Sequence, residues 1–385
     1  MPTVMILGGR APVALDHARR FAWHRWKVLV ADSVPCRTSG WSNAVAATIE
    51  LPPPRDQPRE FARALAAAAQ KHNVDLVLPT CEEVFYVARY RELMPTGVAV
   101  ATDHIDKLRS LHSKLEFLKL AQGCGASVPD SVGVASIEEA RDWARGRPMV
   151  LKPEYSRFGV HVQLHPNGIP ARSAALPLPG RWVAQEFCEG EEICSYSVAV
   201  AGRLTAHVAY RPLYRMSRSS SYYFDPLQVP TIRRFVERLV AKIGYTGQIS
   251  FDWILGNRGS CTVLECNPRA ISGVHLFAAD DSLPRAFTGE EDAVVEPGVP
   301  KPRMLAPLMM TVGLASAIRE SRIADWKHDF GRASDVLLES GDRLPMIGCV
   351  RDFGSHAWRA VRKRCTVREA TTRDIEWDGE VLPEC

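Results

Sequence analysis

Three oxygen-bearing residues in the second half of the chain could together bind a metal ion. Glu265 and Asn267 stand two positions apart in an apolar run, so on a β-strand their side chains would point to the same face. Asp252 lies in a preceding apolar run, separated from Glu265 by the turn GNRGS. A hairpin over 248–255 and 261–267 would bring the three oxygens together, and Mg²⁺ prefers such ligands. The alternative is that the acids lie on a solvated outer face.

Two lysines could neutralise phosphate charge beside such a metal. Lys152 ends the apolar run MVLKP and precedes a loop that includes Ser156, and a lysine held at a strand end is a suitable phosphate ligand. Lys114 stands in a segment with helical pattern, where most lysines are solvated.

The elements that must position these residues begin with an alternation of strands and helices. Strands are predicted at 3–8, 27–33, 75–80 and 97–102, and helices at 12–26 and 58–72. This alternation predicts a parallel sheet covered on both faces. After the first strand, Gly8 and Gly9 permit a tight turn without the spacing of a dinucleotide-binding loop. Asp32 is interpreted as an ordinary acid at a strand end.

From about residue 110 the pattern changes to helices mixed with antiparallel hairpins, which predicts an α+β region. Helices are expected at 112–122 and 136–145, the second with a capping box formed by Ser136 and Glu139. An apolar stripe at helical spacing predicts a buried helix between Pro230 and Gly244.

Two later segments lack such regular patterns. The segment 210–224, YRPLYRMSRSSSYYF, is interpreted as a loop, either binding substrate or lying mobile on the surface. The acid-, Gly- and Pro-rich stretch 287–303 predicts a linker or boundary. Beyond it, helix candidates lie near 311–321 and 353–364.

Composition places the chain among ordinary globular proteins. It has 385 residues, of which 46% are hydrophobic and 24% charged, and its net charge of +4 is too small to indicate a nucleic-acid partner. No apolar run approaches the roughly 18 residues of a transmembrane helix. The ten cysteines form no CxxC pair, and the first residues lack the features of a signal peptide. We therefore expect a cytoplasmic protein with no nucleic-acid and no membrane partner.

Taken in order, these residues resemble the ATP-grasp superfamily, the carboxylate–amine ligases and their relatives biotin carboxylase and carbamoyl phosphate synthetase. HSKLEFLKLAQGCGASVP resembles the family's first lysine segment, with Ser113 where the family usually has Asp, and MVLKP resembles its second lysine strand. AQEFCEGEEICSYSV resembles the hinge between lobes. FDWI and CTVLECNPRAISG together resemble the metal motif, which is the most specific part of a resemblance that covers residues 1–280.

The resemblance implies a fold of three parts. Residues 1–108 would form a doubly wound α/β domain, the preATP-grasp domain. Residues 109–286 would form a two-lobed ATP-grasp domain, with a small lobe at 109–184 and a large lobe at 185–286. Residues 287–385 would form a small α+β region whose role the resemblance does not give.

The resemblance also assigns roles to residues. ATP would be bound by Lys114, Lys152, Ser156, Gln185, Glu186, Cys188 and Glu192, with Glu191 as the alternative to Glu192 at the ribose. Mg²⁺ or Mn²⁺ would be bound by Asp252, Glu265 and Asn267. Arg269 and Lys152 would act in catalysis, and Arg211, Arg215 and Arg269 would bind substrate.

The activity implied is an ATP-dependent ligation. ATP would phosphorylate a small carboxylate, expected to be an amino acid, and an amine would attack the acyl phosphate, releasing ADP and phosphate. Two alternatives stay open: carboxylation or carbamoyl transfer through carboxyphosphate, and a nucleotide-binding module without catalysis. The partners expected are small-molecule carboxylates and amines, and a homodimer is left open.

Overall fold

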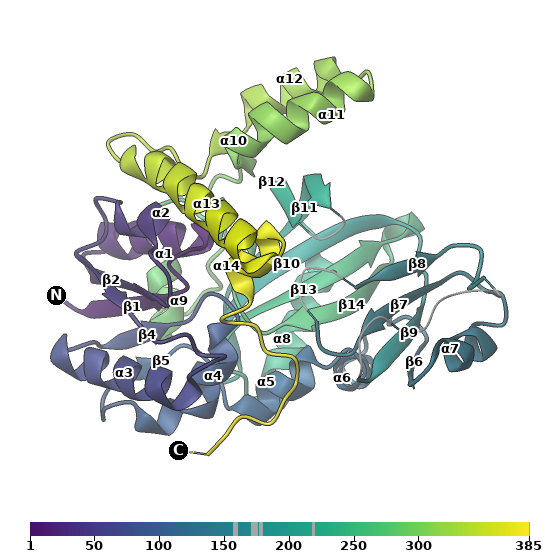
Figure 1. Ribbon diagram of the computed structural model, residues 1–385, viewed down its shortest axis with the longest axis horizontal. Helices are drawn as coiled ribbons and strands as arrows, with labels where there is room; N and C mark the ends of the chain where they lie inside the picture. The colour runs from purple at the N-terminus through teal and green to yellow at the C-terminus, as the bar shows by residue number, and fades with distance from the viewer. Residues whose placement is uncertain (157–160, 171–175, 177–179, 218–219, 385) are drawn as a thin grey trace.

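The computed structural model describes residues 1–156, 161–170, 176, 180–217 and 220–384. Three sheets follow one another across the molecule, with the N-terminal sheet on the left of Figure 1, a large central sheet, and a small sheet on the right. Among the described residues no helix combines the length and the apolar character that a membrane crossing requires.

The N-terminal sheet is parallel throughout and has helices on both faces. Alternate strand residues pack on opposite sides, because Ile6 faces the cluster that contains helix α1 (Pro12–Trp23), whereas Leu7 faces the cluster that contains α3 (Pro58–Lys71). This is the doubly wound arrangement that the sequence predicts. In sheet order the strands are β3 (Ala47–Glu50), β2 (Lys27–Asp32), β1 (Thr3–Leu7), β4 (Leu76–Leu78) and β5 (Ala99–Val100).

The small sheet is antiparallel and is covered by helix α7 (Ile137–Ala144). Ser136 caps this helix as predicted, since its hydroxyl accepts a hydrogen bond from the Glu139 amide. The Glu139 carboxylate instead accepts from the amide of Ala135, one residue before the cap. In sheet order the strands are β6 (Ser131–Val134), β9 (Trp182–Glu186), β7 (Met149–Pro153) and β8 (Gln163–His165).

The central sheet carries the predicted hairpins. Helix α8 (Pro230–Ile243) packs its apolar stripe against one face and ends at Gly244, whose φ of +59° lies in the left-handed region. In sheet order the strands are β14 (Cys261–Asn267), β13 (Gly247–Leu255), β10 (Glu191–Val200), β11 (Arg203–Ser217), β12 (Ser220–Leu227), β15 (Arg303–Met304) and β16 (Ser334–Asp335).

Two sequence predictions are corrected here. The segment 210–224 is not a loop, because its described residues belong to the antiparallel strands β11 and β12, with Tyr223 buried opposite Leu213. The predicted helix 112–122 is interrupted: α5 (Ile105–His112) ends before Ser113, and α6 (Glu116–Gln122) starts again after it. The Ser113 hydroxyl accepts from the Glu116 amide, which supports the break.

The C-terminal part adds two strands to the central sheet and then returns to the N-terminal domain. Helices α11 (Leu314–Arg319) and α12 (Ile323–Arg332) project from the body, and α13 (Leu344–Lys363) lies over α2 (Arg37–Gly40). Among the described residues, the other α-helices are α4 (Glu83–Arg89), α9 (Leu283–Thr288), α10 (Ala306–Leu308) and α14 (Val367–Thr372).

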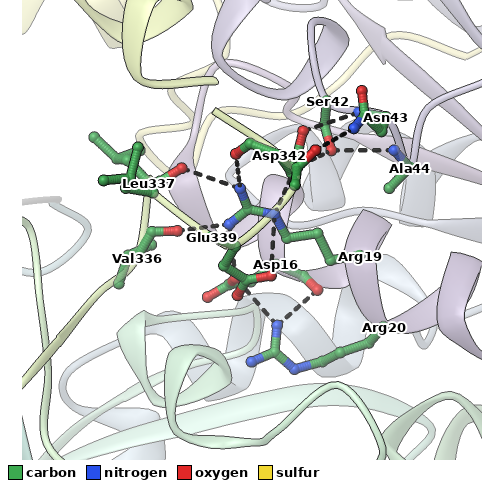
Figure 2. Close-up of polar contacts among 12 residues, drawn as sticks. Asp16, Arg19, Arg20, Ser42, Asn43, Ala44, Val336, Leu337, Glu339 and Asp342 are labelled. Carbon is green, nitrogen blue, oxygen red and sulfur yellow. Dashed lines mark hydrogen bonds and ion pairs between the residues drawn. The ribbon is translucent and has the colours of Figure 1, made fainter. Parts of the chain in front are cut away.

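Buried ion pairs fasten this part to the N-terminal domain. Arg19 of α1 lies 2.8 Å from the Asp342 carboxylate and donates to the carbonyls of Val336 and Leu337 (Figure 2). The same carboxylate accepts from the Ser42 hydroxyl. The segment 336–342 is therefore held from two sides.

A second buried contact corrects the interpretation of Asp32. The Asp32 carboxylate is buried and pairs with Arg10, which follows the Gly8–Gly9 turn. The same guanidinium donates to Asp374 at 2.7 Å and to the carbonyl of Thr371. Asp32 is thus one half of a buried contact that reaches the far end of the sequence.

Candidate active site

The hairpin of β13 and β14 brings the three predicted metal ligands together. Asp252 lies directly opposite Glu265 in the strand register. The Asn267 amide donates to the Asp252 carboxylate at 3.4 Å. The thiol of Cys194, on the adjacent strand β10, donates to the same carboxylate at 3.2 Å, a contact that sequence reasoning did not anticipate. The oxygens therefore converge on one side of the central sheet.

Lys152 reaches this cluster from a different sheet. It stands near the end of β7, is only 5% exposed, and places its Nζ atom 3.6 Å from a carboxylate oxygen of Glu265. Two residues far apart in the sequence thus form an ion pair where the small and central sheets meet. The sequence names each of the two residues as a candidate ligand, but their contact follows only from the packing of the two sheets.

Lys114 occupies the break between α5 and α6. Its Nζ atom donates to the carbonyls of Glu154 at 3.2 Å and Ser156 at 3.4 Å, so the residues after β7 supply its hydrogen-bond acceptors. Burial lowers the pKa of Lys114 to about 8, with Glu265 opposing this effect and Lys152 reinforcing it. The predicted helical lysine is therefore not solvated; it is 4% exposed and lies within electrostatic reach of the hairpin.

The two carboxylates of the hairpin differ in their electrostatics. The sheltered position of Asp252 and the negative charge of Glu265 raise the pKa of Asp252. Burial alone would raise the pKa of Glu265, but the charges of Lys152 and Lys114 outweigh burial and lower it. The pair therefore carries a repulsion that an added cation would relieve.

This electrostatic strain makes the donor set suitable for a divalent cation. Two facing carboxylates and an amide oxygen are the hard ligands that Mg²⁺ and Mn²⁺ accept. In the described part of the chain, no three His, Cys, Asp or Glu side chains gather in a metal-binding arrangement. A metal here would accordingly depend on Asp252, Glu265 and Asn267, with the remaining ligands supplied by phosphate and water.

Arg269 joins the cluster to the N-terminal domain. Its guanidinium donates to the Asn267 side-chain oxygen at 3.2 Å and lies 3.7 Å from the carboxylate of Glu82, which is 1% exposed. Glu82 was missed in the sequence. It stands just after β4, and the carboxyl ends of strands in open parallel sheets are where ligands usually bind, so the run LPTCEE carried a usable signal.

The predicted hinge residues lie at the end of β9. Gln185 is buried and uses its backbone in pairing with both β6 and β7, while its side chain donates to Ser131. Glu186 is exposed and accepts from the Asp130 amide. Cys188 is half-buried, and burial raises the pKa of its thiol. Any backbone contact to a base would therefore have to come from the residues after Gln185.

The predicted ribose acid and substrate arginines form pairs with each other. Arg215 pairs with Glu192, and Arg211 lies 2.7 Å from Glu191. Both pairs join β10 to its neighbour β11. The structure thus brings the two arginines to the hinge side of the site, next to the acids that sequence reasoning assigned to the ribose.

Known proteins resemble this chain in structure, but comparisons of its sequence find no match. No protein-family model and no curated protein sequence matches the chain. Solved structures do. N5-carboxyaminoimidazole synthetase from Staphylococcus aureus, at 15% identity, aligns over 78% of this chain and 80% of its own with a TM-score of 0.59.

Two further structures are similar over a comparable length. Biotin carboxylase from Campylobacter jejuni has 15% identity, covers 76% of this chain and 71% of its own, and gives a TM-score of 0.61. L-amino acid ligase from Bacillus licheniformis has 14% identity, covers 78% of each chain, and gives a TM-score of 0.55. With its doubly wound N-terminal sheet and its paired small and central sheets, the chain has the fold of the ATP-grasp enzymes.

Proposed function

We propose that the chain is an ATP-dependent carboxylate–amine ligase. In the proposed reaction the γ-phosphate of ATP is transferred to a small carboxylate, and an amine then attacks the acyl phosphate. The observation that carries this proposal is the contact between Lys152 and Glu265, because it combines a phosphate-binding cation and a metal-binding acid from two sheets in one place. Phosphoryl transfer depends mainly on positioning and charge neutralisation, which such a site supplies.

Each residue of the candidate site has a proposed role. Lys114 and Lys152 bind the phosphates, next to Ser156, whose carbonyl receives Lys114. Asp252, Glu265 and Asn267 hold Mg²⁺ or Mn²⁺, which would neutralise phosphate charge. Arg269 holds the transferring phosphate or the substrate carboxylate as a planar fork.

The nucleoside would lie at the hinge. Gln185, Glu186 and Cys188 border the base, and Glu192 or Glu191 holds the ribose. Because Arg215 pairs with Glu192 and Arg211 with Glu191, binding of ribose would release an arginine for a substrate carboxylate. An amino acid is the proposed carboxylate substrate, and the cytoplasmic location and the homodimer stay predictions.

Support for ATP comes from similar proteins as well as from the site. The S. aureus synthetase has also been solved in complex with ADP. Transfer through carboxyphosphate is the second candidate, because biotin carboxylase is among the similar structures. Against a nucleotide-binding module with a decayed site stands the presence of Lys152 and of all three candidate metal ligands, Asp252, Glu265 and Asn267.

A phosphate-release screen tests the proposal. Purified protein with ATP and Mg²⁺ is incubated with pairs of amino acids, and separately with bicarbonate, with Glu265→Gln as the inactive control. We expect phosphate release that requires an amino acid and is absent in the variant. Release that requires bicarbonate and no amino acid would instead establish the carboxyphosphate route, and no release in any arm would contradict both.

A further inference from the structure

The last part of the chain runs beside the candidate active site without forming a helix or a strand. After α14, residues 374–384 cross the N-terminal domain toward α4 (Figure 1). The segment is held along its length: Asp374 pairs with Arg10, and the hydroxyls of Tyr86 and Tyr90 donate to the carbonyls of Glu376 and Pro383 at 2.8 and 2.9 Å. It is therefore an integral part of the folded domain.

Trp377 is the centre of this segment. Its side chain is 3% exposed and stacks on Phe85 of α4, with ring centroids 4.6 Å apart. Its indole nitrogen donates to the carbonyl of Glu380, which folds the segment around it. The same ring also forms a T-shaped contact with Tyr155, at a centroid distance of 5.4 Å.

A second residue of the same segment, Gly379, lies against the Tyr155 ring. A Cβ atom at Gly379 would lie 2.5 Å from the Tyr155 ring, so a glycine there is what allows the two to meet. His112, at the end of α5, lies on another side of Tyr155 with ring centroids 6.0 Å apart. The partly buried tyrosine ring is thus contacted by the C-terminal segment and by the helix that precedes Lys114.

The backbone on either side of Tyr155 accepts the hydrogen bonds of Lys114. The carbonyls of Glu154 and Ser156 accept from Lys114 Nζ, and the Glu154 carboxylate accepts from the hydroxyl of Ser113. A shift of the Tyr155 ring would therefore move both carbonyls that aim the lysine. A displacement of a binding group by about 1 Å can cost a site much of its function. The contact between the C-terminal segment and Tyr155 therefore has a direct consequence for ligand binding at Lys114.

We propose that Trp377 is a positioning residue that orients Lys114 toward the phosphates of ATP through Tyr155. The inference rests on the proposed function, because it presupposes that Lys114 meets those phosphates. The inference gives a role to residues 374–384, which belong to the region 287–385 for which the sequence analysis found no role.

A double-mutant cycle tests the inference. The affinity of the full-length protein for the ATP analogue AMP-PNP with Mg²⁺ is measured by calorimetry for wild type, Trp377→Ala, Lys114→Met and the double variant. We expect Trp377→Ala to weaken binding about tenfold in the wild-type background but to add less than about twofold when Lys114 is already removed. Trp377→Phe, which keeps a ring on Phe85, should retain affinity.

A matched control separates positioning from general stability. Leu382→Ala removes another buried side chain of the same segment, so it should lower the melting temperature while leaving AMP-PNP affinity unchanged at a temperature where the protein is folded. Should Trp377→Ala not fold, Gly379→Ala carries the same cycle, because its methyl group would clash with the Tyr155 ring without emptying the core. Since Gly379 has a φ of +86°, the methyl group also strains the backbone, so a melting curve is recorded with each affinity.

Three results overturn the inference. The first is that Trp377→Ala and Gly379→Ala bind AMP-PNP as tightly as wild type does. The second is that the effects of Trp377→Ala and Lys114→Met on affinity are fully additive. The third is that Leu382→Ala loses as much affinity as Trp377→Ala. If wild type itself fails to bind AMP-PNP, the proposed function falls and this inference falls with it, so the two failures are distinguishable.

Discussion

Asp252 and Glu265 stand directly opposite each other on neighbouring strands, and Lys152 approaches Glu265 from another sheet. Burial and the negative charge of Glu265 raise the pKa of Asp252, whereas the charges of Lys152 and Lys114 outweigh burial and lower the pKa of Glu265. The arrangement is costly for a protein that binds nothing there. Under the proposed function, a divalent cation bound by these acids would relieve the repulsion.

Replacing Glu265 by Gln is expected to abolish ATP turnover while keeping the fold. The substitution preserves shape but removes the charge that would hold the metal and that pairs with Lys152. ATPase activity and the thermal melting curve are measured together. Glu60→Gln, on the exposed side of α3, serves as the control and should leave turnover unchanged. Turnover by Glu265→Gln at the wild-type rate would remove the metal assignment.

Lys152→Met should weaken ATP binding far more than Lys71→Met. Both variants lose one positive charge, but Lys152 is buried beside Glu265 whereas Lys71 is exposed at the end of α3. The change at Lys71 should stay within about 0.5 kcal/mol of neutral. Similar losses of affinity in the two variants, measured by calorimetry, would show that Lys152 does not meet the phosphates.

Nucleotide binding is expected to take up a proton at alkaline pH. Because the pKa of Lys114 is lowered to about 8, this side chain is mostly neutral at about pH 8.5 in the free protein, whereas bound phosphates would keep it protonated. Affinity should therefore fall as pH rises through this range. Calorimetry in buffers of different ionisation enthalpy measures the uptake, which should vanish in Lys114→Met. Zero uptake by wild type would contradict the assignment.

Arg19→Met should destabilise the whole protein. The guanidinium is 7% exposed and joins α1 to the segment 336–342 through Asp342 and two carbonyls. Removing one partner of a buried pair costs about 3 kcal/mol, which urea unfolding can resolve. Arg63→Met, at an exposed position of α3, is the matched control. Equal midpoints for the two variants would mean that the C-terminal part is not anchored by Arg19.

The sequence predicted those elements in which local pattern and burial agree. The stripe of α8, the strand MVLKP and the hairpin carrying Asp252 and Glu265 all follow from apolar periodicity, and the structure confirms them. The segment 210–224 was misjudged because Arg211, Arg215 and Ser221 lie at partly exposed strand positions, so their polarity suggested a loop. Only the pairing with β10 and β15 makes it a central part of the sheet.

Contacts between distant parts of the chain could not be predicted. The pairing of Arg10 with Asp374 and the stacking of Trp377 on Phe85 join residues that no local pattern connects. The same holds for Glu82 beside Arg269. Sequence reasoning could name the chemical groups of the site on each element, but only the packing of the elements shows which of these groups meet.

The products of ATP turnover test the central claim most directly. Among the described residues, the site that lies together consists of two lysines, Arg269 and the acid–amide cluster, which suits phosphorylation of a carboxylate. ³¹P NMR of a reaction with the substrates found in the screen should show one ADP and one phosphate for each amide formed. Formation of AMP and pyrophosphate in their place would contradict the acyl phosphate mechanism, even with the fold unchanged.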